Sequence, residues 1–203
     1  MTDIATIQPS ALPSVAAPTG FGIEGMEDIG TRDVVIPRWS IVQPTSRYDD
    51  AGGHEGHFRR NIDGAFAEAL EVVILTIAPT RILWGEKITD GAECVSRDTI
   101  TGSAYGACAS CRFNVSANRD LLAAIHAGTP GTRSCGYGYN YVVADPVTEE
   151  MSYLGAMGAS VRPAKMLHSQ FMQKRRAPFS ALVTFLLRKE QNDKGKFYVL
   201  DGQ

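Results

Sequence analysis

Residues 70–78 read Leu-Glu-Val-Val-Ile-Leu-Thr-Ile-Ala and form the most strongly β-favouring segment of the chain. Five of these nine residues are β-branched. Such side chains lose rotamer freedom in a helix and pack well on the surface of a pleated sheet. We therefore predict a strand over Leu70–Ala78 that ends at Pro79 and resumes over Thr80–Trp84.

Shorter segments of similar composition lie on both sides of this strand. The first, Val34–Val42, contains Pro37, which predicts an edge strand or a bulge. Two further pairs of segments predict hairpins, residues 139–144 with 151–157 and residues 181–188 with 196–200.

Two segments have helical character instead. They are Arg119–Ala127 and Ser160–Lys174, and Pro163 falls in the first turn of the second, where proline is tolerated. Five to seven strands with one or two helices indicate a mainly β (α+β) domain. Among small antiparallel barrels and sandwiches, an OB-like barrel fits this inventory best.

The composition divides the chain into an arm, a domain and an insertion. Residues 1–31 are rich in Ala, Pro, Ser, Thr and Gly and poor in large apolar side chains, so we predict a flexible N-terminal arm. Residues 32–203 are predicted to form the OB-like domain. Within it, residues 85–138 are rich in Gly, Ser and Thr and hold all four cysteines, which predicts an insertion between strands.

The charge is distributed unevenly, although the net charge is only −2. Residues 1–31 carry four acidic residues and no Lys or Arg, whereas residues 162–200 carry nine basic residues and two acidic ones. This polarity favours a polyanionic partner for the C-terminal part. We found neither a long apolar segment nor a signal-peptide pattern, so we expect a soluble, intracellular protein that does not bind membranes.

The four cysteines, Cys94, Cys108, Cys111 and Cys135, have the spacing Cys-x13-Cys-x2-Cys-x23-Cys. The central pair can place two thiolates on one metal ion from a single tight turn. A set of four cysteines closes the tetrahedral coordination of Zn²⁺ and leaves no position for water, as in structural sites. Because the insertion contains little apolar material, metal binding would supply much of its folding free energy. We therefore predict one structural zinc ion.

Two other uses of these cysteines remain open. A pair of disulfides is disfavoured because there is no secretion signal. A redox pair at Cys108 and Cys111 is disfavoured because no βαβ pattern surrounds it. No phosphate-binding loop or nucleophile elbow is present, and the spacing of His54 and His57 does not match a zinc-protease helix. We therefore expect a protein that is not an enzyme.

Basic and aromatic residues alternate in several segments, which is the material of a single-stranded nucleic-acid site, where a cationic groove follows the phosphates and bases stack on aromatic rings. Phe58 follows a Gly-rich loop and is expected on an exposed face, and the cluster Lys174–Arg176 is expected to meet phosphates. Trp39 and Trp84, the latter beside Arg81, could be core or stacking residues. The predicted nucleic-acid-binding residues are Arg38, Trp39, Tyr48, Phe58, Arg59, Arg60, Arg162, Lys165, Lys174, Arg175 and Arg176.

Several of these segments also resemble a group of bacteriophage-encoded proteins. The similar segments are Gly22–Asp28, Asp33–Arg38, Val42–Ser46, Gly56–Phe58, Cys94–Asp98 and Asn192–Tyr198. The group resembles OB-fold single-stranded DNA-binding proteins with a zinc-ribbon insertion, and is similar in organisation to the helix-destabilising replication proteins of large phages. The resemblance implies a role in phage DNA replication or recombination in the cytoplasm of an infected bacterium.

Two functions are therefore expected. The first is sequence-tolerant binding of single-stranded DNA. The second is a zinc-containing protein-interaction or regulatory module that binds a host or phage replication or transcription protein. The second would account for the cysteines and the arm without any nucleic acid.

Overall fold

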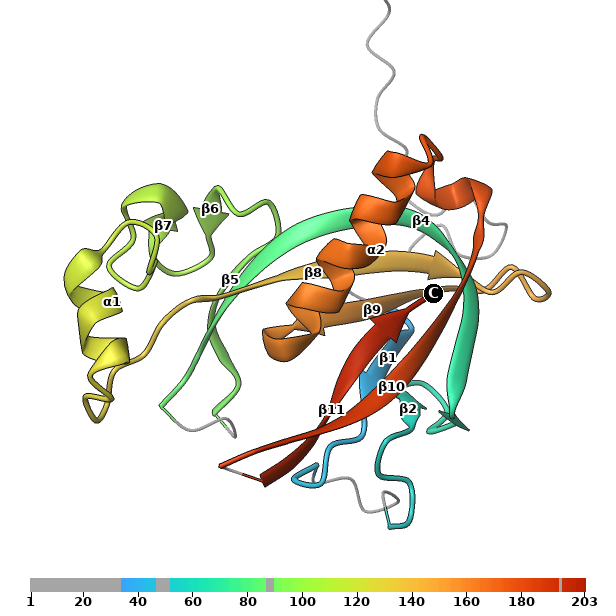
Figure 1. Cartoon of the computed structure of the whole chain (residues 1–203), viewed down its shortest axis with the longest axis horizontal. Coiled ribbons are helices and arrows are strands. Elements are labelled where there is room, and N and C mark those ends of the chain that lie inside the picture. The colour runs from blue at the N-terminus through green and yellow to red at the C-terminus, as the bar shows by residue number, and fades with distance from the viewer. Residues whose placement is uncertain (1–33, 47–51, 87–89, 194) are drawn as a thin grey trace, which may run out of the picture. The chain divides into compact units, whose positions relative to one another are not determined.

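The predicted principal strand is β4 (Ala69–Trp84), the longest element of the computed structural model, which describes residues 34–46, 52–86, 90–193 and 195–203. Leu70, Val72 and Ile74 are buried, as the alternation of a strand with one face on the core requires. In Figure 1, β4 arches around the other strands of the sheet.

The expected break at Pro79 is wrong, because β4 runs through it without interruption. The pairing of β4 explains why. β10 accompanies β4 only as far as Val73, and β5 joins it only from Arg81. Pro79 therefore lies where β4 has a strand on one side only, and a proline without an N–H is tolerated at such a position.

Among the described residues, nine strands form the main sheet, in the order β11-β10-β4-β8-β9-β1-β2-β3, with β5 paired to β4. All neighbours are antiparallel except β1 and β9. Besides β4, these strands are β1 (Arg38–Ile41), β2 (Phe58–Arg60), β3 (Phe66–Ala67), β5 (Ala92–Ser96), β8 (Gly136–Ala144), β9 (Met151–Met157), β10 (Leu182–Asn192) and β11 (Gly195–Gly202).

Both predicted hairpins are confirmed, as β8 with β9 and β10 with β11. The first predicted strand is shorter than expected, because β1 begins only after Pro37. The sequence also predicted too few strands. A separate two-stranded sheet pairs β6 (Thr101–Gly102) with β7 (Gly106–Ala107), and strands this short carry no alternation that a sequence pattern could detect.

Both predicted helices are present, as α1 (Arg119–His126) and α2 (Val161–Gln173). Single-turn 3₁₀ helices lie at Cys108–Ser110, Gly158–Ser160 and Pro178–Ser180. α2 covers the curled sheet, and β5, β6, β7 and α1 gather at the far end of β4 and β8 (Figure 1). The protein is thus mainly β, with a curled half-barrel sheet and two helices.

The core lies inside this curl. Ala164 and Leu167 of α2 meet residues of six strands there, among them Ile74, Tyr141 and Phe185. Phe58 belongs to the same cluster and is completely buried, so the expectation of an exposed Phe58 is wrong. The pairing of β2 with β1 and β3 directs Phe58 inward although a Gly-rich loop precedes it.

Ile36–Gln203 forms one compact unit. The flexible arm predicted for residues 1–31 and the candidate Tyr48 lie outside the described residues. No helix in the described ranges is long and apolar enough to span a membrane.

Candidate nucleic-acid interface and cysteine cluster

All four cysteines line one pocket at the end of the sheet that carries α1. Cys94 lies in β5, and Cys135 immediately precedes β8. Cys108 begins a 3₁₀ turn, and Cys111 follows the last residue of that turn. None of them is in a disulfide. Four residues spread over 42 positions of the chain thus line the same pocket.

Backbone hydrogen bonds fix the positions of the cysteines. The Cys111 N–H donates to the Cys108 carbonyl oxygen (3.3 Å), which closes the tight turn expected from their spacing. The Cys108 N–H donates to Ile100 O (2.7 Å) and the Cys135 N–H to Phe113 O (2.8 Å). A Cβ at Gly102 would lie 2.7 Å from the Cys94 Sγ, so only glycine leaves room for that sulfur.

The thiols differ in their electrostatic surroundings. Burial raises the pKa of Cys94, but backbone N–H groups of Ala104, Tyr105 and Ser103 hydrogen-bond its sulfur and hold the pKa below its ordinary value. Burial raises the pKa of Cys135, Arg81 opposes this, and the negative charges of the other three thiolates raise it further. The Cys135 sulfur is thus close enough to the other three to feel their charge.

Within the described residues, no group of three or more His, Cys, Asp or Glu is arranged to hold a metal ion. The pocket therefore brings the four thiols together, but their sulfur atoms are not arranged as the ligands of a metal ion. The chemistry of the donor set still fits zinc, since four free thiols in one pocket are the complete ligand set of a structural four-cysteine site.

Polar and aromatic side chains support the pocket. Asn114 is buried, donates through Nδ2 to Cys108 O (2.8 Å) and accepts from Arg81 Nη1 (3.0 Å). The Phe113 ring lies between the guanidinium groups of Arg112 (4.7 Å) and Arg133 (5.5 Å). Arg81 therefore ties the cysteine pocket to β4.

Among the described residues, the predicted nucleic-acid-binding residues lie on β1, β2 and α2 with its C-terminal cap. Arg38 is exposed, whereas Trp39 is half-buried and packs against the core. Trp84, which the sequence left undecided, is 45% exposed at the end of β4. Arg59 is half-buried.

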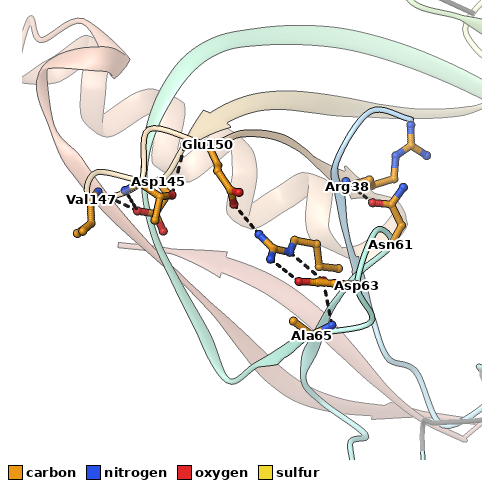
Figure 2. Close-up of polar contacts among 9 residues, drawn as sticks. Arg38, Asn61, Asp63, Ala65, Asp145, Val147 and Glu150 are labelled. Atoms are coloured by element: carbon orange, nitrogen blue, oxygen red, sulfur yellow. Dashed lines mark hydrogen bonds and ion pairs between the residues drawn. The ribbon is translucent and has the colours of Figure 1, made fainter. Parts of the chain in front are cut away.

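Arg60 already has partners for its charge. Its Nη1 contacts Glu150 Oε2 (2.7 Å), its Nε donates to Asp63 Oδ1 (2.9 Å) and its Nη2 pairs with the second oxygen of Asp63 (Figure 2). Its guanidinium lies 5.6 Å from the centre of the Trp39 ring. A phosphate would have to displace two carboxylates here, so we leave Arg60 out of the proposed interface.

The cluster Lys174–Arg176 forms the C-terminal cap of α2. The Arg175 N–H donates to Met172 O (3.1 Å) and the Arg176 N–H to Phe171 O (3.0 Å), and Arg175 has φ +50°. This is the hydrogen-bond pattern of a Schellman motif. All three side chains are exposed, and cations at a helix C-terminus also stabilise the helix dipole.

A ladder of tyrosines on β8 forms an aromatic and cationic site that the sequence reasoning missed. Tyr137, Tyr139 and Tyr141 alternate along the strand and so share one face. Tyr141 is buried under α2, whereas Tyr137 and Tyr139 are half-buried. The repeat of Tyr at every second position from 137 to 141 was the available signal.

Two cations from other elements lie close to the Tyr137 ring. The Arg81 guanidinium of β4 lies 5.5 Å from its ring centre, and the Lys165 Nζ of α2 lies 5.8 Å away. Tyr139 packs edge-on against both Tyr137 (5.4 Å) and His168 (4.5 Å). Burial, together with a hydrogen bond that the Tyr139 hydroxyl donates to Tyr137, raises the pKa of Tyr139 to about 12. Tyr139 is therefore neutral at physiological pH.

No protein-family model, curated protein or solved structure matches this chain.

Proposed function

We propose that the protein binds single-stranded DNA without sequence preference, through an OB-like barrel. The order and connections of the strands support the barrel. Five strands, β11-β10-β4-β8-β9, are neighbours in that order, and α2 joins β9 to β10. A curled, partly open antiparallel sheet of five strands with this Greek-key arrangement is consistent with an OB fold.

In OB folds, oligonucleotides bind on the second and third strands and on the loops between strands one and two and between strands four and five. On the proposed correspondence, β8 and β9 are the second and third strands. The cysteine-containing segment is then the first of the two loops, and the β10–β11 turn is the second. The tyrosine ladder lies on β8, the strand that leads out of that segment.

The observation that carries the proposal is that Arg81 and Lys165 both lie close to the Tyr137 ring. A half-buried ring with two cations beside it combines a stacking surface for a base with charges for the adjoining phosphates. Lys165 was predicted from the sequence, and Arg162 lies one helical turn before it on α2 and is exposed. The cap residues Lys174–Arg176 would extend the cationic surface along the helix.

We further propose that Cys94, Cys108, Cys111 and Cys135 hold one structural zinc ion. Zinc would supply no chemistry to the bound DNA, because a set of four cysteines leaves no open coordination position. The residues around the pocket would orient the thiolates, above all the N–H groups that bond the Cys94 sulfur. Arg81 would then link a rigid insertion to the DNA site.

The resemblance to phage proteins supports a place in DNA replication or recombination, where exposed single strands are protected. The proposed site binds and shields a strand without catalysing a reaction. The setting would be the cytoplasm of an infected bacterium.

The test is fluorescence anisotropy with labelled oligonucleotides. We expect tighter binding to single-stranded than to double-stranded DNA and weaker binding at higher salt. Tyr137→Ala should weaken binding by about 1–3 kcal/mol, as expected for one lost stacking contact, while Tyr137→Phe keeps the ring and the affinity.

Substitution of single lysines provides the second part of the test. Lys165→Gln should lower the slope of log affinity against log salt by about 0.7, the value for one phosphate contact on a single strand. Lys189→Gln is the matched control, since Lys189 is exposed on β10, away from Tyr137. No binding at low salt, or equal losses in the two lysine variants, would refute the proposed site.

α1 favours the second function, that of a protein-interaction module. It has no buried residue, and its apolar side chains Leu122 and Ile125 are each 37% exposed. A stoichiometric partner that survives nuclease treatment in a pull-down, and is lost with Leu122→Ser, would favour this function over the first.

A further inference from the structure

A groove of about 420 Å³ lies beside the first residues of β4. Ala69, Leu70, Glu71 and Val72 all line it. Successive side chains of a strand point to opposite faces, so a groove that touches four consecutive residues runs along the edge of the strand. Trp39 and Arg60 lie on its far wall, and the β8–β9 turn closes one side.

This edge of β4 has no neighbouring strand in the described residues. On one side, β10 pairs with β4 from Ala69 to Val73. On the other side, β8 pairs with β4 only from Val73, which lies opposite Ala144. Alternate residues of a strand direct N–H and C=O groups to opposite sides, so the segment Ala69–Val72 presents backbone donors and acceptors to the groove.

The groove is acidic. Its charged lining residues are Glu71, Asp145, Glu150 and Arg60. Arg60 is already bound to Glu150 and to Asp63 beside the groove (Figure 2). Asp145 accepts hydrogen bonds from the N–H groups of the turn that follows it, and Glu71 has no ion-pair partner among the described residues. The position of Arg60 over Trp39 further shows that this ring accepts a cation on its face.

We propose that this groove binds an extended, Lys- or Arg-rich segment of a partner protein, which adds to β4 as a strand along Ala69–Val72. Strand addition would satisfy the unpaired backbone groups, and the basic side chains would meet Glu71. An acidic groove repels phosphates, so this surface is separate from the proposed DNA site. The inference does not depend on the DNA-binding function.

The probe is a six-residue peptide of alternating Val and Lys, titrated into the full chain and followed by ¹H–¹⁵N NMR. We expect the largest shifts at the amides of Ala69–Val72. A peptide N-methylated at alternate positions cannot complete the ladder and should bind at least tenfold more weakly. A Val and Glu peptide should not bind.

Charge reversal separates this site from general attraction to acidic surfaces. Glu71→Lys should weaken binding of the Lys peptide at least tenfold. The matched control Glu55→Lys makes the same change at an exposed residue outside the groove and should leave affinity unchanged. A circular dichroism spectrum and melting temperature like those of the wild type establish that Glu71→Lys is folded.

Three results would overturn the inference. They are equal binding of the N-methylated peptide, equal losses in the two variants, and shifts at Ala69–Val72 caused by a single-stranded oligonucleotide instead of the peptide.

Discussion

The side-chain amide of Gln43 forms two hydrogen bonds with the backbone of Tyr198. Its Nε2 donates to the Tyr198 carbonyl oxygen and its Oε1 accepts from the Tyr198 N–H, both at 2.8 Å. Gln43 follows β1, and Tyr198 lies in β11, the edge strand at one end of the sheet. One side chain thus stands in for a strand pairing and joins the segment after β1 to the edge strand β11.

Gln43→Glu should therefore destabilise the protein, since the new carboxylate cannot donate and faces a carbonyl oxygen. We expect a loss of about 1–3 kcal/mol in the free energy of unfolding. Urea denaturation measures it. Gln191→Glu, at an exposed position on β10, should change stability by less than about 0.5 kcal/mol, and a similar loss there would contradict this account.

Phe58→Ala should cost about 3–5 kcal/mol of folding stability, because it leaves a cavity in the core. Phe179→Ala removes a ring that is 64% exposed and should cost less than about 0.5 kcal/mol. Thermal unfolding compares the two. Phe58→Leu should keep the DNA affinity of the wild type, and selective loss of DNA binding in that folded variant would show that Phe58 contacts DNA.

Cys111→Ser should release zinc. We expect about one zinc ion per chain in the wild type and nearly none in the variant, because three thiolates and a hydroxyl bind zinc far more weakly than four thiolates. Mass spectrometry of the metal content measures this. Ser110→Ala, one residue away and exposed, is the control and should keep its zinc. A wild type without zinc would refute the metal site.

Arg175→Gly should stabilise the protein by about 1 kcal/mol, because Arg175 occupies the left-handed region with φ +50° and glycine does so without strain. Lys174→Gly is the matched control. It removes the same charge one residue earlier, from a right-handed position, and should destabilise by up to about 1 kcal/mol. Chemical denaturation gives both values, and equal effects would mean that charge, not backbone conformation, decides.

His168 should make stability depend on pH. Its Nε2 lies 2.9 Å from the Tyr141 hydroxyl, and burial lowers its pKa below the ordinary value. The unfolded chain then binds more protons in the range below about pH 6.5, so folding stability falls as the pH falls through that range. Urea titrations at several pH values should show a flatter profile for His168→Gln. His126→Gln, on exposed α1, should leave the profile unchanged.

Local patterns predicted most of the secondary structure. The β8–β9 and β10–β11 hairpins and both helices follow from periodicity and turn residues, which act over a few positions of the chain. The sequence-based prediction was wrong where the neighbouring strands decide whether a strand continues. Pro79 is tolerated only because neither β10 nor β5 lies beside it, and the turn signal in the sequence contains nothing about those strands.

The candidate site, too, could be predicted from the sequence only in part. The spacing of the cysteines alone indicated that they meet, because a tight turn and two long connections are sufficient for that. The sequence identified the basic and aromatic residues by type. It could not show whether their side chains are free to bind a ligand. Arg60 is occupied by carboxylates from its own turn and from the distant β8–β9 turn. Tyr137 gains Arg81 and Lys165 from two other elements.

The sequence by itself determined the β-rich character of the chain, the two helices and the meeting of the four cysteines, since each depends on residue type and short-range spacing. Only the tertiary structure decided that Phe58 is buried, that two cations lie close to Tyr137 and that Gln43 joins the segment after β1 to β11. These relationships depend on the curl of a sheet whose neighbouring strands are far apart along the chain.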